Sequence, residues 1–144
     1  MTHRLRCLAT LAKIRERERL DAQTQLIAAQ QLQDGKSASL TYATDVLAEE
    51  RRIATAGNVT METFRVWFPS GLEKIAYATE EYHNASAATE TARLFALETA
   101  VRHKATETVF RRLEKERNDS HTRREQAVLD ELSLRTRQFI GECL

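Results

Sequence analysis

The side chains best suited to metal binding or acid–base chemistry are two cysteines and four histidines, and they are scattered along the chain. Cys7 and Cys143 lie near opposite ends, and His3 and His121 are the histidines nearest to them. Zinc sites draw their ligands from closely spaced Cys and His pairs, and this spacing does not offer such a set. We therefore expect no metal site. Two cysteines so far apart do not form a disulfide framework, so we expect the protein to reside in the reducing cytoplasm.

Motifs for catalysis are missing from the sequence as well. It contains no Gly-rich phosphate loop, and neither a Ser/His/Asp set nor a paired-carboxylate pocket can be argued from it. His83 and His103 are expected at the edge of a helix–helix seam or on the surface. The sequence thus predicts a protein that is not an enzyme and holds no cofactor.

The elements that carry these residues are predicted to be helices. The chain has one proline and four glycines among 144 residues, and it is rich in Ala, Glu, Arg, Gln and Leu, which lose little on entering a helix. Two long polar segments, Arg4–Ala56 and Leu72–Gln138, flank a short break. We predict an all-α fold, a long antiparallel two-helix coiled-coil hairpin with a C-terminal helical overhang. The apolar runs are far shorter than the ~20 residues of a membrane span, and residues 1–20 do not resemble a secretory signal.

Heptad spacing indicates which faces of the two helices pair. The first helix has Ala22, Leu26, Ala29, Leu40, Ala43 and Leu47 in its stripe, which Gln33, Lys36 and Glu50 interrupt. The second has two alternating rungs, Ile75, Tyr82, Thr89, Ala96, His103 and Phe110, and Ala78, Ala85, Ala92, Thr99, Thr106 and Leu113. These are a/d-type seams, and their small residues let two helices approach closely.

The break between the helices has its own signals. Gly57 and Asn58 can end the first helix through a left-handed residue, Thr60 is a candidate N-cap, and Ser70 to Glu73 fits a capping box. We predict a first helix at about 4–56, a hinge at 57–71 that includes a short helix at 61–68, and a second helix at about 71–138. The second helix is expected to kink at Pro69 or to restart at Ser70.

A turn near Asn58 sets residues opposite each other when their numbers total roughly 117. This register places Ile53 near Phe64. It also sets Leu5, Leu8 and Leu11 against Val109, Phe110 and Leu113, and it leaves Glu114–Leu144 as an overhang. The first part of that overhang, residues 114–126, has no large apolar side chain.

Charge divides the chain into a basic and an acidic part. Residues 1–20 and 102–140 together carry 16 Lys/Arg and 9 Asp/Glu, a net charge of +7, whereas residues 21–101 carry 6 and 11, a net charge of −5. Such polarity steers oriented association with a charged partner, although charge runs often only solvate a helix face. Nucleic acid is not expected as a partner, because Glu16, Glu18, Glu114 and Glu116 interrupt the basic residues.

Aromatic residues gather in the break, where Phe64 and Phe68 share a helix face and Trp67 lies beside them. They either cap the hairpin by packing on Val46 and Ile53 or expose at least one ring as a binding anchor.

Several short motifs occur in a characteristic order. They are Leu8-Ala9-Thr10-Leu11 leading into Arg15-Glu16-Arg17-Glu18-Arg19, then Leu72-Glu73-Lys74, and finally Leu129-Asp130-Glu131-Leu132. On these motifs the chain resembles, from roughly Leu5 to Arg137, the FliJ family of coiled-coil proteins in the flagellar type III export apparatus. The break at Pro69-Ser70-Gly71 departs from the family pattern.

The resemblance implies a cytoplasmic protein, peripheral at the inner face of the cell membrane, that serves flagellum biogenesis and motility. Such proteins resemble the central stalk of rotary ATPases. They sit in the pore of the hexameric export ATPase, promote its assembly, and contact the export gate membrane protein and export chaperones. Together with the charge pattern, the resemblance assigns the ATPase contact to Arg15, Arg17, Arg19, Arg111, Arg112 and Arg117. It matches Phe68 and Leu72 to the family's gate-contacting patch, and the gathering of aromatic residues adds Phe64 and Trp67 to the expected gate contact.

Two alternatives stay open at this point. The chain is compatible with a generic coiled-coil scaffold or adaptor, and also with the equivalent stalk protein of a virulence-type injectisome.

Overall fold

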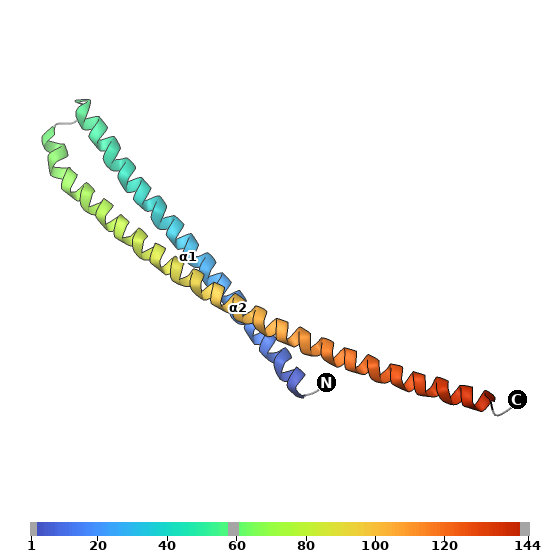
Figure 1. Cartoon of the computed structure of the whole chain (residues 1–144). Helices are drawn as coiled ribbons and strands as arrows, with labels where there is room; N and C mark the ends of the chain where they lie inside the picture. The colour runs from blue at the N-terminus through green and yellow to red at the C-terminus, as the bar shows by residue number, and fades with distance from the viewer. Residues whose placement is uncertain (1–2, 58–60, 142–144) are drawn as a thin grey trace. The chain divides into compact units, whose positions relative to one another are not determined.

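The computed structural model describes residues 3–57 and 61–141, with side chains as far as Arg135. Helix α1 spans His3–Thr55 and helix α2 spans Met61–Gly141, and the described residues contain no strand (Figure 1). The predicted all-α fold is confirmed, and the two helices pack against each other as a hairpin. Thr60, the candidate N-cap, lies outside the described residues.

Contacts between the helices fix their antiparallel register. The Nζ of Lys36 on α1 lies 2.5 Å from Oε2 of Glu81 on α2, and the Thr89 hydroxyl reaches the Ala29 carbonyl. A residue further along α1 thus faces one further back along α2. Both contacts have the register that a turn near Asn58 predicts.

Burial confirms the predicted seams. Every residue of the two α2 rungs, from Ile75 to Leu113, is buried or partly covered in this structure. The same is true of the α1 stripe from Ala22 to Glu50, including the polar residues that interrupt it. Helix α1 and helix α2 therefore use the faces that heptad spacing selects.

The seam is narrow because small side chains form much of it. The buried apolar residues of the described chain are Leu5, Ala22, Ala54 and Ala85, accompanied by Thr89 and Thr99. None of the described large side chains is fully buried. The hairpin therefore has a close helix–helix contact in place of a deep core.

Gly57 ends the first helix as predicted. Its φ of 79° lies in the left-handed region, which glycine adopts without a Cβ clash. The amide of Ala56 donates to the Arg52 carbonyl at 3.0 Å, and the Gly57 amide donates to the Ala54 carbonyl at 3.3 Å. These bonds satisfy two carbonyls of the last turn.

The predicted short helix at 61–68 is wrong as a separate element. Helix α2 begins at Met61 and continues through Pro69 without an interruption. Proline lacks the amide that would bond to the carbonyl four residues earlier, so this helix loses one hydrogen bond near its start. Residues 61–70 are the first turns of α2 rather than part of a hinge.

The chain forms two compact units. One combines α1 up to Arg17 with α2 from Val101 onward, and the other runs from Glu18 to Ala100. Within the first unit, each residue from 115 to 135 is exposed, whereas Leu113 and Glu114 are partly covered. The pairing with α1 therefore stops at about Glu114, and α2 continues as an unpaired helical overhang.

Candidate partner-binding surfaces

The first candidate surface is basic and belongs to the unit that contains the overhang. We call it the basic surface and define it by five of the predicted arginines, Arg15, Arg17, Arg111, Arg112 and Arg117. Four of them are exposed and Arg15 is partly covered. Arg19, the sixth, belongs to the other compact unit and is not part of this surface.

The structure brings some of these arginines together across the two helices. Arg17 of α1 and Arg111 of α2 line one open hollow, which Ala12 and Phe110 also line. In the same hollow, Nε2 of His103 lies 2.8 Å from Oε2 of Glu16. His103 thus occupies the predicted seam position, and its imidazole contacts the carboxylate of Glu16 on α1.

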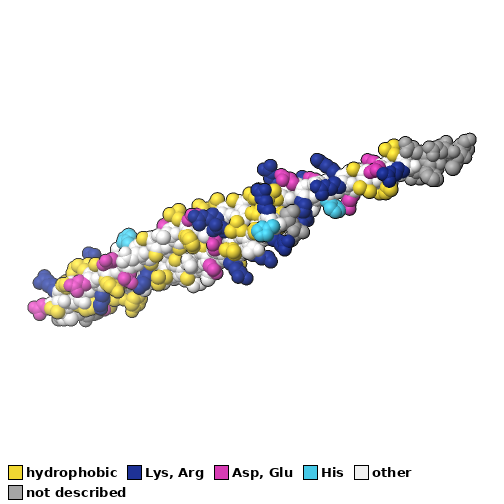
Figure 2. Space-filling model, turned by 90° about the horizontal axis from the view of Figure 1, so that it is seen from below, with side chains coloured by type: hydrophobic (Ala, Val, Ile, Leu, Met, Phe, Trp, Pro, Cys, Tyr) yellow, Lys and Arg dark blue, Asp and Glu magenta, His cyan; other side chains and the backbone are white. Residues whose placement is uncertain are grey.

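Carboxylates on α2 balance part of the positive charge. Glu107 accepts a 2.5 Å contact from Arg111 and a 3.2 Å contact from Lys104, and Arg112 lies 2.9 Å from Glu116. The hydrogen bond from Lys104 and the charge of Arg111 hold the pKa of Glu107 below its ordinary value of 4.5. Figure 2 shows basic and acidic side chains near one another on the face in view. This arrangement suits a partner with its own patterned charges better than a uniform phosphate backbone.

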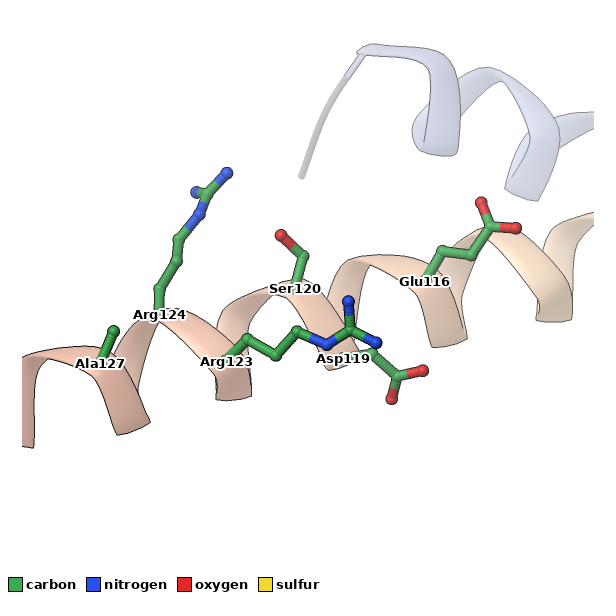
Figure 3. A pocket seen from close by; sticks show the side chains of 6 residues that line it. All are labelled: Glu116, Asp119, Ser120, Arg123, Arg124 and Ala127. Atoms are coloured by element: carbon green, nitrogen blue, oxygen red, sulfur yellow. The ribbon is translucent and has the colours of Figure 1, made fainter. Parts of the chain in front are cut away.

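In the overhang, the heptad positions that form the seam elsewhere hold polar and basic residues. Positions 117, 120 and 124 continue the heptad rung of Phe110 and Leu113, but they are Arg117, Ser120 and Arg124. Figure 3 shows Ser120 and Arg124 projecting to one side of α2, in a shallow hollow that residues of α2 alone line. Nothing in the described chain pairs with this face, because α1 covers no residue beyond Glu114.

The second candidate surface is the aromatic group at the start of α2. The ring centroids of Phe64 and Phe68 are 5.3 Å apart with planes tilted by 40°, a geometry that attractive aromatic pairs adopt. Phe64 and Trp67 also line a hollow of about 130 Å³ with Glu50 and Ala54 of α1. All three rings are partly covered, so they contribute to the hairpin as well as to the surface.

Apolar side chains beside these rings are more exposed. Leu72, one of the predicted gate-contact residues, is 47 % exposed, and Val66 is 83 % exposed. Val66 was not among the predicted contact residues, although its place between Phe64 and Phe68 is visible in the sequence. Val66 and Leu72 therefore add exposed apolar area to this surface.

Gly71 explains how closely the helices approach here. A Cβ at this position would lie 2.9 Å from Cδ1 of Leu47 and 3.1 Å from Cζ3 of Trp67. Gly71 is buried, so its missing side chain makes room for Leu47 from α1. Gly71 thus has a packing role in the seam.

Metal ligands are sparse in the described chain. Cys7 Sγ lies 3.7 Å from Nδ1 of His3, one helical turn away, and no group of three or more His, Cys, Asp and Glu residues gathers within the described residues. Cys143 lies outside them. In the described ranges, neither helix has a stretch that is long and apolar enough to cross a membrane.

Comparisons with known proteins add no identification. The chain matches no protein-family model, and neither a curated protein nor a solved structure shows significant similarity to it.

Proposed function

We propose that this chain is a FliJ-like stalk protein of a type III export apparatus, flagellar or of the injectisome type. In this proposal the basic surface and the overhang contact the ring-shaped export ATPase. The aromatic group at the start of α2 contacts the export gate, and export chaperones dock on the hairpin. The protein itself does not catalyse a reaction and acts on the cytoplasmic side of the membrane.

The overhang is the observation that supports the ATPase contact best. Its residues 115–135 are exposed, and its seam positions change from Phe110 and Leu113 to Arg117 and Arg124 where α1 no longer covers them. An uncovered helix gains nothing from tertiary packing, which supplies most helix stability in proteins. A partner that lines the helix on several sides would stabilise it, and an axial pore would provide such surroundings.

Charge favours a partner with acidic loops. The segments that form this unit, residues 1–17 and 101–144, carry 15 Lys/Arg and 9 Asp/Glu, a net charge of +6. Exposed arginines on both helices contribute to this charge. A stalk that binds the assembled ring more tightly than the free ATPase subunit shifts assembly toward the ring.

The test measures ATP hydrolysis by the purified export ATPase with and without this chain. We expect the variant with Arg15, Arg17, Arg111 and Arg117 changed to Glu to lose most of the stimulation and most of its salt sensitivity. The matched control changes Arg51, Arg52, Arg65 and Lys74 to Glu, four exposed basic residues of the other unit. Undiminished stimulation by the first variant would disprove the ATPase contact, and equal loss in both would show a general effect of net charge.

The gate contact needs a variant that separates binding from folding. Trp67 packs against Gly71, so its truncation changes the hairpin as well as the surface. Leu72→Gln alters a side chain that is already half exposed. We expect this variant to bind the gate's cytoplasmic domain more weakly with an unchanged thermal midpoint. Unchanged binding would remove Leu72 from the contact.

A further inference from the structure

Four large aliphatic side chains are exposed in the unit that runs from Glu18 to Ala100, toward the end of this unit that lies away from the turn. Leu20 and Ile27 on α1 are 47 % and 48 % exposed, and Leu94 and Leu97 on α2 are 65 % and 62 % exposed. The pairing of α1 with α2 does not use them, and neither the ATPase contact nor the gate contact includes them.

Heptad geometry places the four residues on one side of the hairpin. Ile27 follows Leu26, an a-type seam residue of α1, and Leu20 lies one heptad before Ile27. Leu97 follows Ala96, an a-type residue of α2. In an antiparallel pair the positions that follow a on each helix lie on the same side. Leu94 is one turn from Leu97 on the same outward arc.

A hollow in the other unit supports this assignment. Lys13 lies one heptad before Leu20, and Arg111 lies two heptads after Leu97. Lys13 and Arg111 line the same hollow, so these heptad positions of α1 and α2 do share a side. The register given by Thr89 and Ala29 then sets Leu20 at the level of Leu97.

This side is also unusual in its lack of net charge. From residue 20 to 31 on α1 and from 86 to 100 on α2, the flanking positions are Gln23, Thr24, Gln30, Ser86, Ala87 and Ala100. Asp21 and Glu98 also fall in these ranges, but at the next heptad position, which faces the other side of each helix. The charged residues at the positions of this side are Glu90 and Arg93, whose Oε1 and Nη1 lie 3.1 Å apart. They neutralise each other in a sequence of which 30 % is charged.

The size of the patch decides between two kinds of occupant. Four half-exposed aliphatic side chains offer roughly 200–400 Å² of apolar surface. A stable dimer of two copies needs about 800 Å² from each, so self-association is the weaker choice. A single helix laid along the line between two helices needs only such a stripe.

We propose that the side of the hairpin formed by Leu20, Ile27, Leu94 and Leu97 binds the apolar face of a partner protein's amphipathic helix. The helix completes a three-helix bundle over about three turns, and its contacting face is flanked by uncharged polar residues. This interaction is independent of the ATPase and gate contacts, and it survives if the proposed export function is wrong.

The test uses the full chain and three fluorescent model helices of about 18 residues with the same leucine stripe. The residues flanking the stripe are Gln in one peptide, Glu in the second and Lys in the third. We expect the Gln peptide to bind tightest by fluorescence anisotropy, with a Kd that changes little with salt, because the patch has no net charge. Leu97→Gln and Ile27→Gln should each weaken it by about tenfold.

Leu32→Gln is the matched control, since Leu32 is 55 % exposed on α1 but lies on the opposite side by heptad position. It should leave binding unchanged, and circular dichroism should show the same helix content for all variants. Absence of binding by the Gln peptide, tighter binding of a charged peptide, or equal binding to Leu97→Gln would overturn the proposal. So would a dimer, seen by sedimentation, that Leu97→Gln abolishes, because a second copy would then occupy the patch.

Discussion

The hydroxyl oxygen of Thr89 on α2 lies 3.2 Å from the backbone carbonyl oxygen of Ala29 on α1, and 2.9 Å from the carbonyl oxygen of Ala85 on its own helix. A threonine side chain is short, so the two backbones must approach closely for it to reach the partner carbonyl. The hydroxyl shares its proton between the two acceptors. Thr89 is 7 % exposed, so this contact replaces part of an apolar core.

A larger side chain at this point should separate the helices. We expect Thr89→Leu to lower the free energy of unfolding by about 1–3 kcal/mol, the usual cost of overpacking a close contact. Urea unfolding followed by circular dichroism measures the change. Thr91→Leu is the control, because Thr91 bonds the Ala87 carbonyl in the same way but is exposed. Equal stability of the two variants would mean that the helices are not in close contact at Thr89.

Substitution by alanine should change the stability of the hairpin differently at the two glycines inside the helices. A Cβ at Gly35 would meet no other side chain or facing backbone atom within 4 Å, so Gly35→Ala should stabilise the hairpin by roughly 0.5–1 kcal/mol through helix propensity. Gly71→Ala should lose that gain, because Leu47 and Trp67 must move to admit the methyl group. The fluorescence of Trp67, the sole tryptophan, should shift in Gly71→Ala alone. Stabilisation of both variants by the same amount would show that Gly71 has free space.

The register of α1 and α2 in the unit of residues 1–17 and 101–144 can be measured by crosslinking. With both native cysteines changed to Ser, Leu8→Cys and Phe110→Cys should be joined efficiently within one chain by a short thiol crosslinker. Phe110 lines a hollow with Ala12, one turn from Leu8, which supports this pairing. Leu8→Cys with Leu132→Cys is the comparison, since Leu132 lies in the exposed overhang. Efficient joining of the second pair would require a different register.

Acid should weaken the contacts around Glu107. Its pKa is held below 4.5 by the hydrogen bond from Lys104 and by Arg111, so the folded state favours the ionised carboxylate. This stabilisation is fully present above pH 4.5 and is lost as the pH falls through the lowered pKa. Glu107→Gln should therefore flatten the fall of the thermal midpoint in acid.

Glu73→Gln serves as the reference for that titration. Glu73 is exposed, and no ion pair involving it occurs in the described part of the chain. Its removal should leave the acid dependence as it is in the parent protein. The interpretation fails if the two variants have the same slope below pH 4.5.

Local patterns predicted much of this fold because a two-helix seam repeats one contact many times. Gly57 marked the end of the first helix, and the heptad rungs through Thr89 and Ala85 marked the pairing faces. A single register satisfies both, so the pairing of Leu5 and Leu8 with the region of Phe110 followed. Burial agrees for these residues, although Leu11 and Val109 are 38 % and 48 % exposed.

The course of the chain through Pro69 could not be predicted in the same way. Proline signals a break because of its missing amide, but here the preceding two turns place Phe64 and Trp67 beside Glu50 and Ala54 of α1. Packing across helices outweighs the local cost, and no pattern within residues 61–73 reports it. The partner surfaces are still harder to predict from the sequence, because the exposure of Leu72 or Leu97 depends on which face of α2 is left uncovered by α1.

A seam of alanine and threonine also has a calorimetric consequence. Because Ala22, Ala85, Thr89 and Thr99 bury little apolar area, unfolding hydrates little new hydrocarbon. The heat-capacity increment per residue should fall below the usual 12–15 cal/mol/K or so of compact domains. The stability curve of this hairpin is then flatter than that of a globular domain, with a weak maximum. Cooling would change its free energy of unfolding only slightly. Its resistance to cold would come from the small apolar area that the seam buries.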